Sequence, residues 1–122
     1  MTSLSFNDWD LEKHVADAIG QLGWEEPTQI QVEAIPFARK GMDVVGQART
    51  GSGKTAAFGI PIIESCEPNG STQAIVLCPT RELAVQVAEE FQALQGKKGL
   101  RIETVYGGTD IEKQARLLDK GV

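Results

Sequence analysis

The sequence predicts an α/β fold in which helices cover both faces of a parallel sheet. Segments with helical apolar spacing alternate with short, β-branched apolar runs, an order that favours a parallel sheet. The run Ala74–Cys78 is continuously apolar, as is typical of a strand buried on both faces. The 122 residues are 41% hydrophobic and 24% charged, values that indicate a single globular domain or less.

Two helices are expected before the first strand. The first starts at Asp8 or Asp10, stops at Gly23, and has an apolar face made of Leu11, Val15, Ala18, Ile19 and Leu22. Thr28 can cap the second helix, which ends near Gly41 and carries the apolar residues Ile30, Ala34 and Phe37. Each helix can therefore rest one face on a core.

Three strand–helix pairs are expected to follow. The strands are predicted at Asp43–Gln47, Ala74–Cys78 and Arg101–Tyr106. The helices are predicted at Lys54–Glu64, at Arg81–Gln95 and, after a cap at Thr109, through Ile111, Ala115 and Leu118. Glycines separate strand from helix at Gly51–Gly53 and at Gly107-Gly108.

Charge and cysteine content narrow the function classes. The 12 basic and 17 acidic residues give a net charge of −5, which does not favour nucleic-acid binding but leaves room for a local site. The longest uncharged stretch, Pro68–Thr80, is shorter than the about 20 apolar residues of a membrane span, and the first ten residues are not expected to act as a secretion signal. With Cys66 and Cys78 as its only cysteines, the protein is expected to be reduced and cytoplasmic.

The segment Ala48–Thr55 follows a predicted strand and opens a predicted helix, which is the setting of a phosphate-binding loop. Its glycines let backbone N–H groups surround phosphate oxygens, and the helix start adds the positive end of its dipole. Lys54 would reach the β- and γ-phosphates, and the Thr55 hydroxyl would bind Mg²⁺. Ala48 stands where the generic pattern has glycine. The alternative is a Gly/Ser turn beside a helix. It requires that the motif arose by chance, and the odds of such a match in a chain of this length are on the order of 1%.

The segment Gly23–Gln31 bears on the choice of base. The amide of Gln31 can donate and accept at once, which matches the N6/N7 edge of adenine and mismatches guanine. Trp24 offers a flat face on which a base can stack. The residues alone leave open that Trp24 is a core side chain and Gln31 a solvated helix residue.

Three separated segments resemble the DEAD-box family of ATP-dependent RNA helicases. Gly23-Trp24 with Pro27–Gln31 resembles the adenine-sensing Q motif, and Phe6 stands where the family keeps an upstream aromatic residue. The other matches are the phosphate loop Ala48–Thr55, which in this family begins with alanine, motif Ia at Pro79–Ala84, and the glycine doublet Gly107-Gly108. The resemblance extends over almost the whole chain.

The resemblance implies a partial RecA-like (P-loop) domain with ATP and Mg²⁺ as cofactors and RNA as partner. The residues it implies for nucleotide binding are Phe6, Trp24, Thr28, Gln31, Ala48, Arg49, Thr50, Gly51, Ser52, Gly53, Lys54 and Thr55. Among them, Lys54 and Thr55 would be catalytic, and Thr55 would be the metal ligand. The residues it implies for contact with the RNA backbone are Pro79, Thr80, Arg81, Glu82, Gly107 and Gly108.

The sequence contains no Asp-Glu-Ala-Asp segment, which in the resembled family organises Mg²⁺ and the attacking water. Residues 1–122 are therefore expected to be a truncated first helicase domain, inactive by itself, of a parent that couples ATP hydrolysis to RNA duplex unwinding. Unpaired strand edges would then promote self-association. Two alternatives remain: a P-loop module of another class, such as a small-molecule kinase, and a non-enzymatic chain that binds RNA or a partner.

The basic residues gather at one place, Lys97-Lys98 with Arg101. They are expected to lie in a solvated loop rather than to steer RNA.

Overall fold

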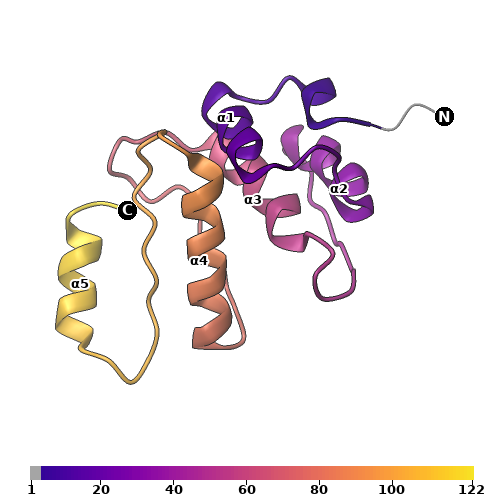
Figure 1. The fold of residues 1–122 in the computed structure, drawn as a ribbon. Helices are drawn as coiled ribbons and strands as arrows, with labels where there is room; N and C mark the ends of the chain where they lie inside the picture. Colours follow the sequence, from indigo (N-terminus) through magenta and orange to yellow (C-terminus); the bar gives the residue numbers. More distant parts are fainter. Residues whose placement is uncertain (1–3) are drawn as a thin grey trace.

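The computed structural model describes residues 4–122, which fold into helices joined by long irregular connections (Figure 1). A short 3-10 helix, η1 (Phe6–Trp9), comes first. The α-helices that follow are α1 (Lys13–Leu22), α2 (Gln29–Arg39), α3 (Lys54–Ser65), α4 (Arg81–Gln95) and α5 (Ile111–Asp119). All five predicted helices are therefore confirmed. No helix in the described part of the chain is long and apolar enough to cross a membrane.

The predicted strands are not present in residues 4–122. Asp43–Gln47, Ala74–Cys78 and Arg101–Tyr106 lack regular secondary structure, and no backbone hydrogen bond joins any two of them. A strand forms only where another backbone lies alongside to accept and donate. The predicted parallel sheet is therefore not confirmed, and most apolar side chains of these segments are exposed, although Cys78 and Ile102 pack partly against the core. Val45 and Leu77 are 102% and 91% exposed.

Local hydrogen bonds explain where the helices begin and end. Gly23 ends α1 in the left-handed conformation with φ of 75°, as predicted. The predicted start at Asp8 or Asp10 is wrong because Asp8 belongs to η1, where its carboxylate accepts from Ser5 N at 2.8 Å. Helix α1 begins after Glu12 instead.

The caps of the later helices follow the same logic. Thr28 is the N-cap residue of α2, as predicted, and Thr80 Oγ1 accepts from Leu83 N at 3.2 Å to cap α4. The cap of α5 is Asp110 rather than Thr109, because the Asp110 carboxylate accepts from two backbone N–H groups of the first turn.

The hydrophobic core lies between the first four α-helices. Helix α3 packs against α1, α2 and α4. The fully buried side chains at its centre are Val15, Ile35, Ile60, Ile63 and Leu94. Gly59 allows the close approach of α4, because a Cβ atom there would lie 3.0 Å from the Phe91 ring. This packing holds the start of α3, where the phosphate-binding loop was predicted.

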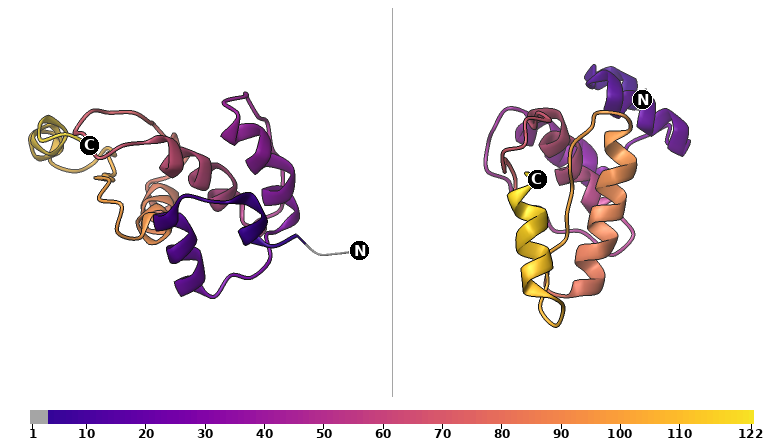
Figure 2. Two further views of the ribbon diagram at one scale, coloured as in Figure 1. Left: turned by 90° about the horizontal axis from the view of Figure 1, so that it is seen from above. Right: turned by 90° about the vertical axis from the view of Figure 1, so that its left-hand side faces the viewer.

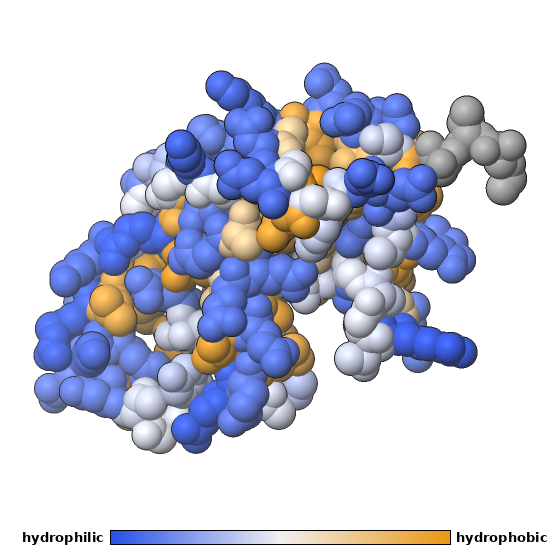
Figure 3. Space-filling model, in the orientation of Figure 1, coloured by the Kyte–Doolittle hydropathy of each residue, from blue (hydrophilic) through white to orange (hydrophobic). Residues whose placement is uncertain are grey.

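Helix α5 stands apart from this core. It buries none of its residues, and Figures 1 and 2 show it beside α4 and away from α1 and α2. In Figure 3, hydrophobic residues reach the surface between hydrophilic ones, both over the core and in the part that holds α4 and α5. This apolar surface is exposed because residues 4–122 do not form the sheet that would have covered it.

Candidate functional site

The phosphate loop leads directly into α3. Gly51 and Gly53 have φ of 80° and 85°, left-handed values that other residues rarely adopt. Gly53 is the N-cap residue of α3, and no side chain caps that end. The free N–H groups of the first turn and the positive end of the dipole are therefore open to an anion. This geometry fits the phosphates of a nucleotide.

Gln31 is buried, with 3% of its surface exposed, and is therefore not the solvated residue of the alternative interpretation. Its Oε1 accepts from Thr28 N at 3.0 Å, and its Nε2 donates to the carbonyl oxygen of Gly53 at 3.1 Å. The side chain thus joins the start of α2 to the phosphate loop. One Nε2 hydrogen and one Oε1 lone pair remain for a ligand.

Two aromatic side chains of the predicted nucleotide site contact each other. The rings of Phe6 and Trp24 have centroids 6.2 Å apart and are tilted by 32°. Phe6 is buried, and its ring also meets Trp9 edge-on at 5.7 Å. Trp24 is half-buried, so part of it can face a ligand.

A cleft of about 810 Å³ joins these groups, a size typical of small-molecule sites. The sequence-predicted residues that line it are Phe6, Trp24, Thr28, Gln31, Thr50, Gly51, Gly53, Lys54 and Thr55. Ala48, Arg49 and Ser52 are not among the lining residues. Ser52 and Arg49 instead close a turn, in which the Ser52 N–H donates to the Arg49 carbonyl oxygen at 3.2 Å.

The far wall of the cleft was missed by sequence reasoning. It comes from the end of the second predicted strand and from one face of α4, namely Val76, Leu77, Cys78, Leu83, Gln86, Val87 and Glu90, together with Glu26 and Phe58. The spacing of Leu83, Gln86 and Glu90 along α4 is a helical face, a signal that could have suggested a shared wall.

Magnesium has one predicted ligand here. Thr55 is half-buried and lines the cleft. Across residues 4–122, no three His, Cys, Asp or Glu side chains gather as a metal cluster. The position of the Thr55 hydroxyl in the cleft fits one ligand of a nucleotide-bound Mg²⁺, which takes most of its remaining ligands from phosphate and water.

The predicted RNA-contacting segments meet around Arg81. The Arg81 guanidinium carbon lies 5.5 Å from the centroid of the Tyr106 ring, a cation–π contact. A Cβ atom on Gly108 would lie 3.2 Å from Arg81 Nη2. Motif Ia and the glycine doublet are thus adjacent. The other residues predicted to contact RNA are exposed, namely Pro79, Thr80, Glu82 and Gly107, and none of the residues predicted to contact RNA lines the cleft.

The expectation of a solvated basic cluster is wrong for Lys98. Its side chain is 5% exposed, and Nζ donates to Glu12 Oε2 and to the Ile63 carbonyl oxygen, each at 2.7 Å. The ammonium group thus neutralises the carbonyl end of α3, where a cation is favourable. Lys97 is exposed, as predicted.

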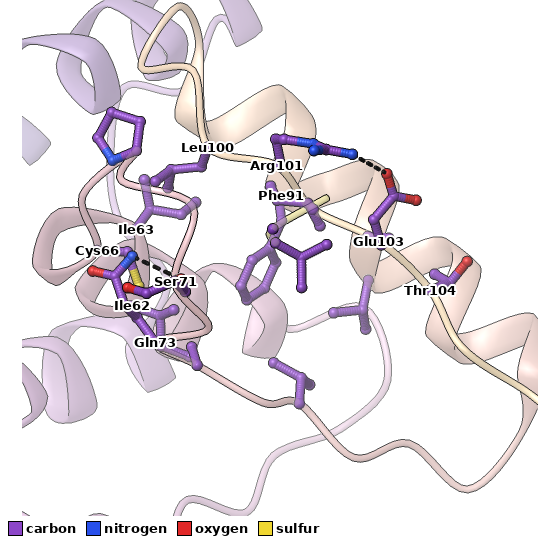
Figure 4. Close-up of a pocket in the computed structure, with 18 of the residues that line it drawn as sticks. Ile62, Ile63, Cys66, Ser71, Gln73, Phe91, Leu100, Arg101, Glu103 and Thr104 are labelled. Atoms are coloured by element: carbon purple, nitrogen blue, oxygen red, sulfur yellow. Dashed lines mark hydrogen bonds and ion pairs between the residues drawn. The ribbon is translucent and has the colours of Figure 1, made fainter. Parts of the chain in front are cut away.

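A second, smaller cavity lies along the neighbouring face of α4 and shares Val76, Cys78 and Val87 with the cleft (Figure 4). It measures about 270 Å³ and runs between residues 70–78 and residues 99–105, against α3 and α4. Figure 4 shows Ile62, Ile63, Phe91 and Leu100 around it. None of the residues predicted for nucleotide or RNA lines it.

Comparison with known proteins adds three relatives. DEAD-box ATP-dependent RNA helicase CshA from Geobacillus kaustophilus is 49% identical over 117 residues, which cover 95% of this chain and 25% of CshA. The crystal structure of a DEAD box protein from the hyperthermophile Methanococcus jannaschii matches with a TM-score of 0.89 and 47% identity, over 93% of this chain and 32% of that one. The crystal structure of the RNA helicase Prp28 from Chaetomium thermophilum bound to ADP matches with a TM-score of 0.80 and 36% identity, over 99% and 30%.

The chain therefore spans about a quarter of the length of the CshA relative. The family model for DEAD/DEAH box helicases matches residues 28–122. This segment contains the start of α2, the phosphate loop and the Arg81–Tyr106 contact, whereas Phe6 and Trp24 lie before it. Because it covers well over half of the chain, this protein belongs to the DEAD/DEAH box helicase family.

Proposed function

We propose that this chain supplies the ATP-binding and RNA-contacting part of an ATP-dependent RNA helicase. The cleft that joins Gln31, the Phe6–Trp24 pair and the phosphate loop carries the proposal. CshA is named an ATP-dependent RNA helicase, and the solved Prp28 chain is described as bound to ADP. Membership of the helicase family argues against a P-loop module of another class.

Different residues of the cleft would bind different parts of the nucleotide. The free amide hydrogen and lone pair of Gln31 suit the N6/N7 edge of adenine. Trp24, supported by Phe6, offers a face for the base. Lys54 and the backbone N–H groups at the start of α3 would hold the phosphates, and the Thr55 hydroxyl would hold Mg²⁺. The cation would neutralise charge on the phosphates.

RNA would be bound through its backbone. Arg81 presents a fork of N–H donors and is held by the Tyr106 ring next to Gly108. Thr80 and Arg81 stand at the start of α4, where backbone N–H groups favour phosphate. Because the whole chain carries a net charge of −5, affinity for RNA is expected to be local and to fall as salt rises.

The turnover of ATP and the unwinding of duplex RNA are proposed for the whole protein rather than for residues 1–122. The sequence offers Lys54 and Thr55 to the phosphates and to Mg²⁺, without the Asp-Glu-Ala-Asp segment of the family. The RecA-like parallel sheet, a cytoplasmic location and self-association of the 122 residues are parts of the same proposal.

Calorimetric titration of residues 1–122 with Mg²⁺–ADP and Mg²⁺–GDP tests the adenine site. We expect ADP to bind, GDP not to bind, and Gln31→Ala to remove the preference. Gln29→Ala is a matched control, because Gln29 is exposed and its amide contacts only Glu33, at 3.4 Å. A preference for ADP that survives Gln31→Ala, or absence of nucleotide binding, would contradict the proposed site.

A further inference from the structure

The first described residues are fastened to the helical core by a distant arginine. We call residues 5–12 the N-terminal strap; it is the indigo segment before α1 in Figure 1. Arg39, the last residue of α2, donates from Nη1 to the Trp9 carbonyl oxygen at 2.6 Å and from Nη2 to the Asp10 carbonyl oxygen at 3.4 Å. One side chain thus holds two consecutive peptide units of the strap.

Glu64 fixes the direction of that arginine. Its Oε1 lies 2.9 Å from Arg39 Nε, and its Oε2 accepts from the backbone N–H of Glu12 at 3.0 Å. The Glu64 side chain is 13% exposed and that of Arg39 is 31% exposed, so solvent only partly screens the pair. The carboxylate therefore binds the strap directly at Glu12 and indirectly through Arg39.

The fastened strap carries Phe6, which stands in the wall of the cleft. Helix η1 has only four residues, too few to hold its own position, and its hydrogen bonds at Ser5 and Asp8 are local. Asp10 has φ of 52° and is the one non-glycine residue in the described part of the chain with a left-handed backbone. Such a conformation persists only where its surroundings impose it. Arg39 supplies that support at the Asp10 carbonyl.

We propose that Arg39 and Glu64 are positioning residues for the base: they hold the strap so that Phe6 and Trp24 form the wall on which adenine stacks. Neither residue lines the cleft. Arg39 lies eight positions beyond Gln31 on α2, about 12 Å along the helix axis. The proposal rests on the proposed adenine site and adds the residues that shape its aromatic side.

A merely structural role would weaken binding of every ligand of the cleft alike. A positioning role for the aromatic wall predicts a selective loss. Mg²⁺–ADP should bind less tightly to Arg39→Met, whereas Mg²⁺–tripolyphosphate, which has no base, should bind as it does to the unmodified chain. The expected loss of affinity for ADP is roughly 5- to 20-fold, which is within the range that stacking of a base on an aromatic side chain contributes.

Arg101→Met is the matched control. Arg101 also donates to a backbone carbonyl, that of Lys120 at 2.9 Å, and faces a carboxylate, that of Glu103 at 4.0 Å. It lines the smaller cavity and not the cleft. The same change there should leave the affinity for ADP unaltered. Arg39→Lys should recover part of the loss. One ammonium group can reach only some of the four atoms that the guanidinium contacts, which are the carbonyl oxygens of Trp9 and Asp10 and both carboxylate oxygens of Glu64.

Tryptophan fluorescence tests the positioning without any nucleotide. The sequence has two tryptophans, so Trp9→Phe leaves Trp24 as the one reporter. In that background Arg39→Met should raise quenching of Trp24 by acrylamide, because Phe6 no longer covers it. Arg101→Met should leave the quenching unchanged.

The two readouts separate the proposals. Unchanged quenching of Trp24, or an equal loss of ADP and tripolyphosphate, overturns the positioning role while the adenine site stands. Increased quenching in a chain that binds no ADP supports the positioning of the aromatic pair and overturns the proposed function. A selective loss of ADP together with increased quenching supports both.

Discussion

The side-chain amide of Gln31 donates to the carbonyl oxygen of Gly53 at 3.1 Å and so ties the start of α2 to the start of α3. At the other ends of the same two helices, Arg39 Nε lies 2.9 Å from Glu64 Oε1. The two helices therefore run in the same direction and are joined at both ends. One junction is at the phosphate loop and the other holds the N-terminal strap, so the shape of the cleft depends on both.

The first prediction concerns the fit between Gly53 and Gln31. A Cβ atom on Gly53 would collide with Gln31 Nε2, whereas one on Gly51 would meet nothing within 4 Å. Both glycines have left-handed φ, so alanine at either position carries a similar backbone strain of roughly 1–2 kcal/mol. Gly53→Ala should lower the free energy of unfolding by a further ~1–3 kcal/mol through overpacking.

Urea unfolding of the two single variants measures that difference. The cause can be assigned by combining Gly53→Ala with Gln31→Ala, because a shorter side chain removes the collision. In that background the extra destabilisation should shrink. Equal unfolding free energies for Gly51→Ala and Gly53→Ala would show that the collision has no effect.

The helices could be predicted from sequence because their signals are local. Gly23 ends α1 and Thr80 caps α4 through bonds to residues within five positions, and the predicted helix end at Gly23 and helix start at Arg81 are both confirmed. The strands at 43–47, 74–78 and 101–106 could not be predicted with the same security. Their β-branched apolar residues describe a segment suited to a sheet, but a strand also needs a neighbouring backbone, which no local pattern specifies.

The candidate site could likewise be predicted from sequence only in part. The predicted nucleotide residues from Phe6 to Thr55 largely come together in one cleft, because their motifs lie at helix starts that the core holds in place. Tyr106, Lys98 and Arg39 carry no motif, and their contacts join residues far apart in the sequence. Such tertiary contacts depend on how helices pack, so sequence reasoning missed all three.

The second prediction concerns Tyr106, which holds Arg81 through its ring. Tyr106→Leu should weaken binding of a single-stranded RNA roughly 2- to 5-fold, the equivalent of a cation–π contact of about 0.5–1 kcal/mol. Tyr106→Phe keeps the ring and should bind RNA as the unmodified chain does. Fluorescence anisotropy at low salt measures the affinities. Equal weakening by both variants would exclude the ring as the cause.

The third prediction concerns the buried ammonium group of Lys98. Lys98→Met leaves Glu12 and the carbonyl oxygens of Ile63 and Glu64 without their cation. Because the Glu12 side chain is 30% exposed, water can still solvate it, and the main cost is the carbonyl oxygens left without a donor, so the free energy of unfolding should fall by about 1–3 kcal/mol. Lys97→Met is the control, since Lys97 is exposed and should change little. Thermal unfolding followed by circular dichroism would contradict the prediction if both variants melted together.

The fourth prediction is that residues 1–122 bind nucleotide without hydrolysing it. Phosphoryl transfer needs a positioned metal, a positioned water and cationic charge on the transferred group, and the cleft presents Lys54 and Thr55. A phosphate-release assay with ATP, Mg²⁺ and RNA should show no turnover above background. Release that RNA stimulates and that Lys54→Ala abolishes would overturn this prediction.

The fifth prediction is that the 122 residues associate with copies of themselves. Val45 and Leu77 belong to different predicted strands, are 102% and 91% exposed, and lie in segments without backbone partners. Exposed apolar segments with free N–H and C=O groups pair with another chain. Sedimentation velocity should therefore show larger species as the concentration rises.

The double variant Val45→Lys with Leu77→Lys should remain monomeric, because charges on both segments oppose pairing. Ile111→Lys, at a 77% exposed position that begins α5, places a charge outside the three predicted strands, so it should associate like the unmodified chain. A monomer at all concentrations, or equal suppression by Ile111→Lys, would show that the unpaired segments do not drive association.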